Sequence, residues 1–205
     1  MNSIVSTTYF GPIQWYQKLN RSEKTWIERY DNYQKQSYRN RCVIATTNGL
    51  QALTVPVERP AEGLHRTWVR DLRISDHGNW RHLHWQALMS AYGESPFFEY
   101  YADDIRPYFE RKWEYLFDFN MDICHTMCDL LDIRPIIEPT DDYRHDFPEG
   151  IVDYREVIHP KHPGEDATFE IRPYYQVYGQ KHGFQANLSI LDLLFNMGPE
   201  GIFYL

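Results

Sequence analysis

Apolar and polar residues follow one another along the first third of the chain in short runs that favour one helix and then several strands. The pattern predicts a helix that starts near Pro12 and ends before Ser22. Short runs rich in β-branched and aromatic residues follow, and the pair Asn48-Gly49 is typical of a hairpin turn. The predicted strands cover residues 25–30, 41–45 and 52–57, with a further possible strand at 71–74.

Apolar positions in the middle of the chain recur at helical spacing. Asn79 is a candidate N-cap, and Gly93 is a candidate residue just past the end of this helix. Ser95-Pro96 is expected to open a short helix, because proline suits the first helical position after a capping residue. The predicted buried stripe of the first of these helices consists of Trp80, Leu83, His84, Ala87, Leu88 and Ala91.

A longer helix is predicted to begin at Pro107. Its apolar stripe has a single polar interruption, at Asn120. The apolar members of the stripe are Phe109, Trp113, Leu116, Phe117, Ile123, Met127 and Leu130.

The last third begins with a stretch rich in Pro, Gly, Asp and His over residues 139–168. This composition predicts a loop, and a loop of that length inside a compact domain is often functional or mobile. Two short strands are predicted after it, at 169–171 and 174–178. A strongly apolar helix over residues 187–196 closes the chain, with Asn187 as its expected N-cap and Gly198-Pro199 after its end.

Helices and strands interleave without any shift in composition that would mark a domain boundary. The sequence therefore predicts one α/β domain over residues 1–205, with a mixed sheet and a helical middle. An α+β arrangement is the alternative, because contiguous helices between two groups of strands would also produce this order of elements.

The chain is acidic and rich in aromatic residues. A formal net charge of −8 argues against a general nucleic-acid binder, so no nucleic-acid partner is predicted. The 16 Tyr and 6 Trp residues carry a polar group on an apolar ring, which suits ligand-binding walls as well as cores. No signal peptide and no membrane-spanning run are recognised, and three cysteines without framework spacing favour a reduced, cytoplasmic protein.

Cations and tyrosines are concentrated in the stretch YQKQSYRNR, which covers residues 33–41. Arginine presents a planar fork of donors that matches phosphate or carboxylate, and tyrosine rings can stack on a base or a sugar. In an extended conformation, Lys35, Arg39 and Arg41 would lie on one face together with Tyr33. Tyr38 adds a second ring. The alternative is that these cations pair with some of the chain's 29 carboxylates.

His84 is the strongest candidate for a catalytic base. It lies on the apolar stripe of its predicted helix, so the imidazole is expected to be buried and neutral at pH 7. A core histidine with its hydrogen bonds satisfied is the alternative, and it is the more common case. His77, His82 and His84 lack the i, i+4 spacing of metal ligands on a helix, so no metal site is predicted.

The last helix carries one polar stripe on an otherwise apolar surface, formed by Ser189, Asp192 and Asn196. This stripe could face water or a polar cavity, and the sequence leaves both open. Known phosphate-binding, dinucleotide-binding, nucleophile-elbow and zinc-protease motifs do not occur, so no cofactor is predicted. The three cysteines are interpreted as core residues.

Four segments taken in order resemble the WbqC-like protein family. The resemblance covers most of the chain and is least distinctive over residues 135–170. It departs at the start, where Thr7-Thr8 stand in place of the Gln-Pro that many members have before the aromatic turn. The segments are YFGPI at residues 9–13, YQKQSYRNRC followed by LTVPVE, NWRHLHWQALMSAYGESPFFEYY, and KHGFQANLSILDLLFNMGPEG.

The resemblance implies a role in bacterial O-antigen and surface-polysaccharide biosynthesis. Transfer of glycine or another small acyl group to a sugar is the activity suggested for members, without an established set of catalytic residues. The family's signature positions correspond here to Lys35, Ser37, Arg39, Asn40, Arg41, Trp80, Arg81, His84, Asn187, Ser189 and Asp192.

The leading hypothesis is a cytoplasmic enzyme that acylates a nucleotide-linked amino sugar. The nucleotide sugar, or another phosphorylated small molecule, would be bound by cations and stacked on Tyr33 or Tyr38. His84 would take the proton of the amine, and Asp192 would orient that base or the acceptor. The remaining predicted binding residues are Lys35, Arg39, Asn40, Arg41, Arg81, Asn187 and Ser189. The alternative is a non-catalytic phosphosugar-binding or scaffold protein of the same pathway.

Overall fold

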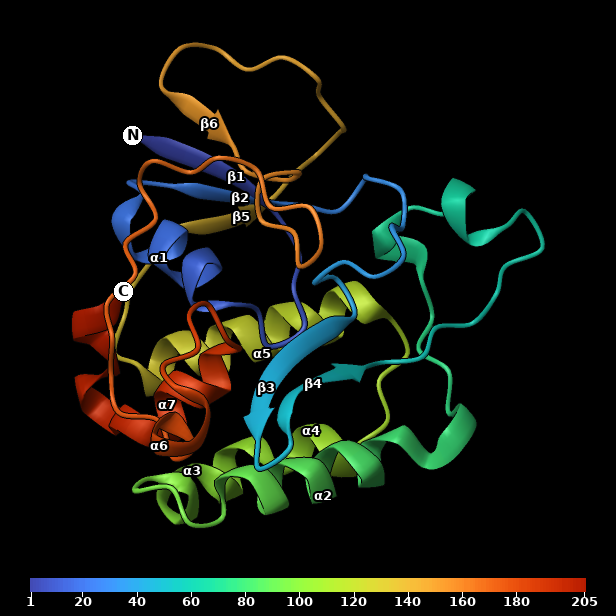
Figure 1. The fold of residues 1–205 in the computed structure, drawn as a ribbon. Helices are drawn as coiled ribbons and strands as arrows, with labels where there is room; N and C mark the ends of the chain where they lie inside the picture. The colour runs from blue at the N-terminus through green and yellow to red at the C-terminus, as the bar shows by residue number, and fades with distance from the viewer.

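The strands form two separate sheets (Figure 1). The computed structural model describes residues 1–205. The main sheet is parallel throughout and has the strand order β5-β2-β1-β6. Its strands are β1 (Asn2–Ser6), β2 (Thr25–Glu28), β5 (Ile137–Pro139) and β6 (Ile151–Asp153). The second sheet is an antiparallel hairpin of β3 (Arg41–Thr46) and β4 (Gly49–Thr54).

Helices fill the space between the two sheets and close the far end of the molecule. In Figure 1 the main sheet lies at the top, and α2, α3 and α4 lie at the bottom beneath the hairpin. The helices are α1 (Ile13–Arg21), α2 (Trp80–Tyr92), α3 (Phe98–Ile105), α4 (Pro107–Glu110), α5 (Leu116–Leu130), α6 (Gly179–His182) and α7 (Ile190–Met197). A continuous cluster of 43 buried apolar residues forms a single core, to which the short helix α6 contributes no side chain.

The predicted fold class is confirmed, because parallel strands, a hairpin and a helical middle make one mixed α/β domain. The parallel and antiparallel strands lie in separate sheets. The helix after Pro12, the hairpin around Asn48-Gly49 and the helix from Trp80 form as predicted. Three strands of the main sheet, β1, β5 and β6, were not predicted, and β6 lies inside the stretch that was expected to be loop.

The predicted helix from Pro107 to Leu130 is wrong as a single element. It divides into α4 and α5, because residues 111–115 run alongside residues 72–74 instead of continuing the helix. The backbone nitrogen of Ile74 donates to the carbonyl of Glu114 at 2.9 Å, and Leu116 N donates to the carbonyl of Leu72 at 2.9 Å. Residues 71–74 therefore form single bridges and part of a 3-10 turn in place of the possible strand.

The strands predicted at 169–171 and 174–178 do not form. Their backbone groups bond to side chains instead of to a neighbouring strand. Glu170 N donates to Oε1 of Gln17 at 3.1 Å, and Val177 N donates to Oδ1 of Asn196 at 3.3 Å. Amide side chains thus satisfy backbone groups that a sheet would otherwise pair.

Several helix ends differ from their predictions. Gly93 keeps a right-handed helical conformation, with φ −54°, so it is not a left-handed cap. Asn79 has φ 48° and forms no side-chain cap. The short third helix starts at Phe98, and α7 is capped by Ser189, whose hydroxyl accepts from Leu191 N at 3.3 Å. Leu83, expected in the buried stripe of α2, is 58% exposed.

Candidate functional site

The strands of the main sheet are added on both sides of β1, so the strand order reverses there. From β1 the chain passes through α1 to β2 on one side, whereas β6 pairs with β1 on the other side. In open α/β sheets, ligands bind outside the carboxyl ends of the strands near such a reversal. Those ends are at Ser6, Glu28, Pro139 and Asp153.

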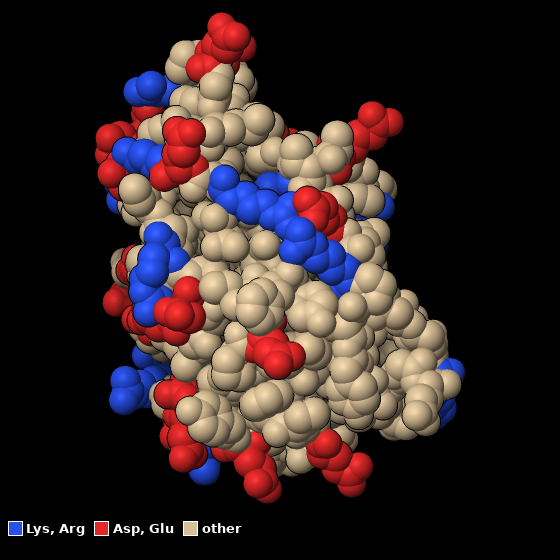
Figure 2. Space-filling view, turned by 90° about the vertical axis from the view of Figure 1, so that its left-hand side faces the viewer, with Lys and Arg blue, Asp and Glu red and all other residues tan.

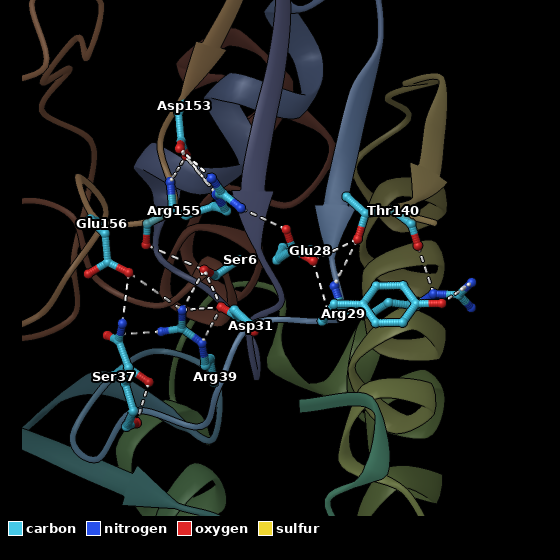
Figure 3. A network of polar contacts seen from close by, with 12 residues as sticks. Ser6, Glu28, Arg29, Asp31, Ser37, Arg39, Thr140, Asp153, Arg155 and Glu156 are labelled. Atoms are coloured by element: carbon cyan, nitrogen blue, oxygen red, sulfur yellow. Dashed lines mark hydrogen bonds and ion pairs between the residues drawn. The ribbon is translucent and has the colours of Figure 1, made fainter. Parts of the chain in front are cut away.

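A buried network of ion pairs lies along this edge (Figure 3). Arg39 is only 2% exposed and donates from Nε and Nη2 to the same carboxylate oxygen of Asp31. Its Nη2 also donates to Oγ of Ser6 at 2.8 Å. Burial raises the pKa of Asp31 above its usual value, although the guanidinium of Arg39 acts in the opposite direction.

A second buried pair joins the remaining strand ends. Arg155 donates to Glu28 at 2.8 Å and to Asp153 at 2.7 Å. Glu28 also accepts from the hydroxyl of Thr140 at 2.7 Å and from the backbone nitrogen of Tyr30 at 2.8 Å. The guanidinium groups of Arg39 and Arg155 therefore both donate to acceptors of the protein itself. Their hydrogen bonds link the four strand ends to one another.

The space at the reversal itself is nearly closed. A cavity with room for about one water molecule lies there, bordered by Thr8, Tyr38 and Arg155 among others. The hydroxyl of Thr8 is buried without a hydrogen-bond partner, and Oδ1 of Asp31 is likewise unpartnered. A sugar or nucleotide does not fit in this cavity.

An open groove of about 500 Å³ lies farther along the same edge, beyond the ends of β2 and β5. Its volume falls within the range of roughly 300–1,000 Å³ that is usual for ligand sites. The groove is lined by Arg29, Arg70, Asp71, Tyr115, Phe117, Asp118, Met121 and Pro139.

Two guanidinium groups meet over one ring beside this groove. The Cζ atoms of Arg29 and Arg70 lie 5.2 and 4.6 Å from the ring centre of Tyr30. Arg70 also lies 5.1 Å from the ring of Trp68, which is 45% exposed. The two arginines become neighbours because Arg70 N donates to the carbonyl of Arg29 at 3.1 Å. Such cation–π contacts hold the guanidinium planes in place.

These two arginines keep hydrogen-bonding capacity that the buried ones have used. Arg29 forms no ion pair, and its Nε donates to the carbonyl of Thr140 at 2.8 Å. Nε of Arg70 is buried without a hydrogen bond and lies 3.4 Å from Oδ1 of Asp71. Both Nη atoms of Arg70 and Nη1 of Arg29 form no hydrogen bond, whereas Nη2 of Arg29 donates to the hydroxyl of Tyr30 at 3.5 Å. The groove therefore offers guanidinium Nη donors next to aromatic surface, which suits an anion attached to a ring.

Sequence reasoning missed this groove. Neither Arg29 nor Arg70 is among the predicted site residues. The available signal was the repeated pairing of arginine with an aromatic residue, at Arg29-Tyr30 and at Trp68–Arg70. The two segments are far apart in sequence, so only the fold shows that they are adjacent.

The predicted basic stretch is not extended, and residues 35–40 form turns and bends. Lys35 is exposed, whereas Arg39 points into the buried network. Arg41 lies on β3 and donates to the hydroxyl of Thr54 at 3.2 Å. The three cations therefore do not share one face.

The tyrosines of that stretch are partly or wholly enclosed. Tyr33 is half-buried, and burial raises its pKa above the usual value. Burial also raises the pKa of Tyr38 to about 12. Arg81, near the start of α2, donates to Asp76 at 2.6 Å and to the carbonyl of Arg111 at 3.1 Å.

His84 is buried among aromatic rings, as expected. Its Nδ1 lies 2.9 Å from the hydroxyl of Tyr9, and its ring packs against Trp80 with a centroid distance of 5.1 Å. Burial lowers the pKa of His84 to about 4, so the imidazole is neutral at pH 7. This geometry is that of a core histidine with a hydrogen-bonded partner.

Asp192 is also enclosed, at 1% exposure. It accepts from the hydroxyls of Tyr92 at 2.8 Å and Tyr174 at 2.6 Å, and from Nε2 of Gln176 at 3.0 Å. Burial raises the pKa of Asp192, against the effect of these hydrogen bonds. The polar stripe of α7 thus faces polar side chains of the interior, and not water.

The other predicted binding residues connect segments of the backbone. The hydroxyl of Ser189 donates to the carbonyl of Phe10 at 2.8 Å. Oδ1 of Asn187 accepts from Gln14 N at 2.9 Å, and Nδ2 of Asn40 donates to the carbonyl of Val55 at 2.8 Å. The hydrogen bonds of Arg39, His84 and Asp192 thus belong to three separate networks.

Lys and Arg side chains lie at several places on the surface (Figure 2), and many of them are paired with carboxylates. Figure 2 views the side that carries α1 and the C-terminal end, where some Lys and Arg side chains form a short diagonal band and others lie near the edges of the view, with acidic groups beside them. Arg21 and Arg172 both pair with Glu170, at 3.0 and 2.5 Å. Below the band the surface is mostly uncharged. None of the helices combines the length and apolar character that crossing a membrane requires.

Comparison with protein families supports the resemblance seen in the sequence. The model of the WbqC-like protein family matches residues 7–162. The chain belongs to the WbqC-like protein family. The matched range includes the whole lining of the groove and both buried ion pairs at the sheet edge.

The WbqC-like chain is also similar to a mycobacterial protein. It is 29% identical to the uncharacterized protein Rv1507c of Mycobacterium tuberculosis (strain ATCC 25618 / H37Rv), over 86% of this chain and 85% of that protein. No solved structure matches the chain.

Proposed function

We propose that this WbqC-like protein binds a phosphorylated sugar, in the form of a nucleotide sugar, in the groove beside Arg29 and Arg70. The observation that carries the proposal is the pair of guanidinium groups over the ring of Tyr30, at the carboxyl edge of a parallel sheet. Two fixed planar cations suit the oxygens of a phosphate or diphosphate better than flexible lysines do. Because Tyr30 already holds the two guanidinium groups in place, less side-chain entropy is lost when a ligand binds.

The rest of the groove suits the remainder of such a ligand. Phe117 and Met121 supply apolar contact, and Tyr115 adds an aromatic ring with a hydroxyl. Asp71 and Asp118 provide carboxylates that can accept hydrogen bonds from sugar hydroxyls. A ligand with an anionic end and a hydroxyl-rich end would satisfy both kinds of group.

Membership in the WbqC-like family supports a place for this binding in surface-polysaccharide biosynthesis. Within that role, the finer activity is transfer of glycine or another small acyl group to a sugar amine. His84 as the base and Asp192 as its partner stay predictions. Both side chains are enclosed and neither lines the groove, which favours a phosphosugar-binding role as the second candidate.

Calorimetric titration with UDP-glucose tests the proposed binding. Arg29→Ala and Arg70→Ala are each expected to weaken binding by about tenfold or more, because each loses charge-assisted hydrogen bonds worth roughly 1.5–3 kcal/mol. Arg106→Ala is the matched control, since Arg106 is an exposed arginine paired with Glu110 on α4. Equal affinity in all three variants, or no binding of any nucleotide sugar by the wild type, would overturn the proposal.

A further inference from the structure

A second ligand-sized space lies over the face of the main sheet. It is a cavity of about 170 Å³ between the strands and the segment of residues 139–151. The volume is below the roughly 300 Å³ at which sites for drug-sized ligands begin, so it suits a single ring. No predicted site residue lines it.

The floor of this cavity is apolar and aromatic. Ile4 and Trp26 are paired neighbours on β1 and β2, and Ile151 begins β6. Phe147 lines it as well, and its ring is held by the guanidinium of Arg155 at 5.1 Å. Aromatic rings suit the faces of a sugar, which present C–H groups, while its hydroxyls point outward from the ring edge.

The rim of the cavity is acidic. Glu138 pairs with Lys24 at 2.6 Å, and Asp142 pairs with Arg144 at 2.9 Å. Asp141 is exposed and takes part in no hydrogen bond or ion pair. Carboxylates accept hydrogen bonds from hydroxyls, and they repel phosphate. The cavity is lined by three carboxylates and one arginine, whereas the groove is lined by two carboxylates and two arginines, so the cavity is the more negative of the two.

The two spaces adjoin at the end of β5. Pro139 lines both the cavity and the groove. Thr140 lines the cavity, and its carbonyl accepts from Nε of Arg29 at 2.8 Å. Ligands in the two spaces would thus lie on either side of the backbone at Pro139 and Thr140.

From this arrangement we infer that the cavity binds an unphosphorylated sugar ring, next to the phosphorylated sugar in the groove. Trp26 and Phe147 would contact the ring, and Asp141 would accept hydrogen bonds from its hydroxyls or its amine. The inference rests on the proposed function, because it makes this sugar the second ligand of the same protein.

Saturation-transfer NMR on the full chain measures this binding directly. The probes are glucose, glucosamine and glucose 6-phosphate, each added to the wild type with and without UDP-glucose. Transfer to glucose or glucosamine is expected in both conditions, because UDP-glucose occupies the other space. Glucose 6-phosphate is expected to compete with UDP-glucose instead. A stronger signal from glucosamine than from glucose would identify the amine as the group that Asp141 contacts, and the reverse would identify a hydroxyl.

Variants separate this site from the groove. Asp141→Asn is expected to reduce transfer to the neutral sugar at least twofold, with Asp103→Asn on α3 as an exposed control. Trp26→Ala removes the aromatic contact with the sugar ring. If that variant fails to fold, Trp26→Phe, which keeps an aromatic side chain at this position, replaces it. Loss of UDP-glucose binding alone would contradict the proposed function, whereas absence of sugar transfer with UDP-glucose still bound would overturn only the cavity. Unchanged transfer in Asp141→Asn and in Trp26→Phe or Trp26→Ala would also overturn it.

Discussion

Nδ1 of His84 lies 2.9 Å from the hydroxyl of Tyr9, inside a layer of aromatic rings between α2 and the turn after β1. Burial lowers the pKa of this imidazole from 6.5 to about 4. The unfolded chain therefore binds the proton more readily than the folded one. The stabilising contribution is complete above pH 6.5 and is lost as the pH falls towards 4. The loss is expected to reach about 3 kcal/mol.

Thermal unfolding of the wild type and of His84→Gln between pH 7 and pH 4.5 measures this contribution. Raised carboxyl pKa values at Asp31 and Asp192 act in the opposite direction but are common to both proteins. The wild type should lose more stability with acid than the variant. Parallel pH curves would show that His84 titrates normally, and so has a route to solvent.

Asp31→Asn is expected to destabilise the fold by about 3–5 kcal/mol, because it leaves the buried guanidinium of Arg39 without its counter-charge. The comparison is Asp71→Asn, which removes the partner of Arg70 on the surface and should cost no more than about 1 kcal/mol. Urea unfolding of both variants measures the difference. Similar losses would mean that the Arg39 pair is not buried.

Asp192→Asn replaces an acceptor-only carboxylate with an amide facing the hydroxyls of Tyr92 and Tyr174. A loss of about 1–3 kcal/mol in the free energy of unfolding is expected, since donors then lack acceptors. The affinity for UDP-glucose should remain that of the wild type. A stable variant with weakened binding would instead place Asp192 at the ligand.

All three cysteines are expected to resist thiol reagents at pH 8 until the protein unfolds. They are buried, and burial raises the pKa of Cys42 to about 12. The pKa of Cys124 is also raised, with its contact to Cys128 as the main cause. Labelling with a chromophoric disulfide should give no reaction in buffer and full reaction in denaturant. Rapid labelling of a thiol in buffer would contradict the packing of the core.

Local sequence signals predicted much of the fold. Helical spacing located α1 and α2, and Asn48-Gly49 located the hairpin, because these patterns act between near neighbours in the chain. Strands β1, β5 and β6 were missed since each is short and is stabilised by its partner, as in the pairing of Ser3 with Val152 and of Thr25 with Ile137. The break at residues 111–115 was missed for a similar reason, because a distant segment, residues 72–74, pairs with it.

The candidate site was harder to predict than the fold. Helical spacing correctly indicated that His84 would be buried, but residue type did not show that Arg39 would be paired with Asp31. Charge alone does not distinguish a cation that has a buried counter-ion from one with free donors. Arg39 has a buried counter-ion, whereas Arg29 and Arg70 lie over an aromatic ring, and only contacts made on folding produce this difference.

Arginine side-chain NMR during titration with UDP-glucose tests the central claim most directly, because it reports which guanidinium groups meet the ligand. The Nη–H resonances of Arg29 and Arg70 should shift together and saturate at the affinity measured in the calorimetric titration, because the Nε of Arg29 already donates to Thr140 and the Nε of Arg70 is buried. Those of Arg39 and Arg155 should stay in place, since their donors are already bound to carboxylates. Shifts confined to Arg39 and Arg41, with Arg29 and Arg70 unchanged, would contradict the account.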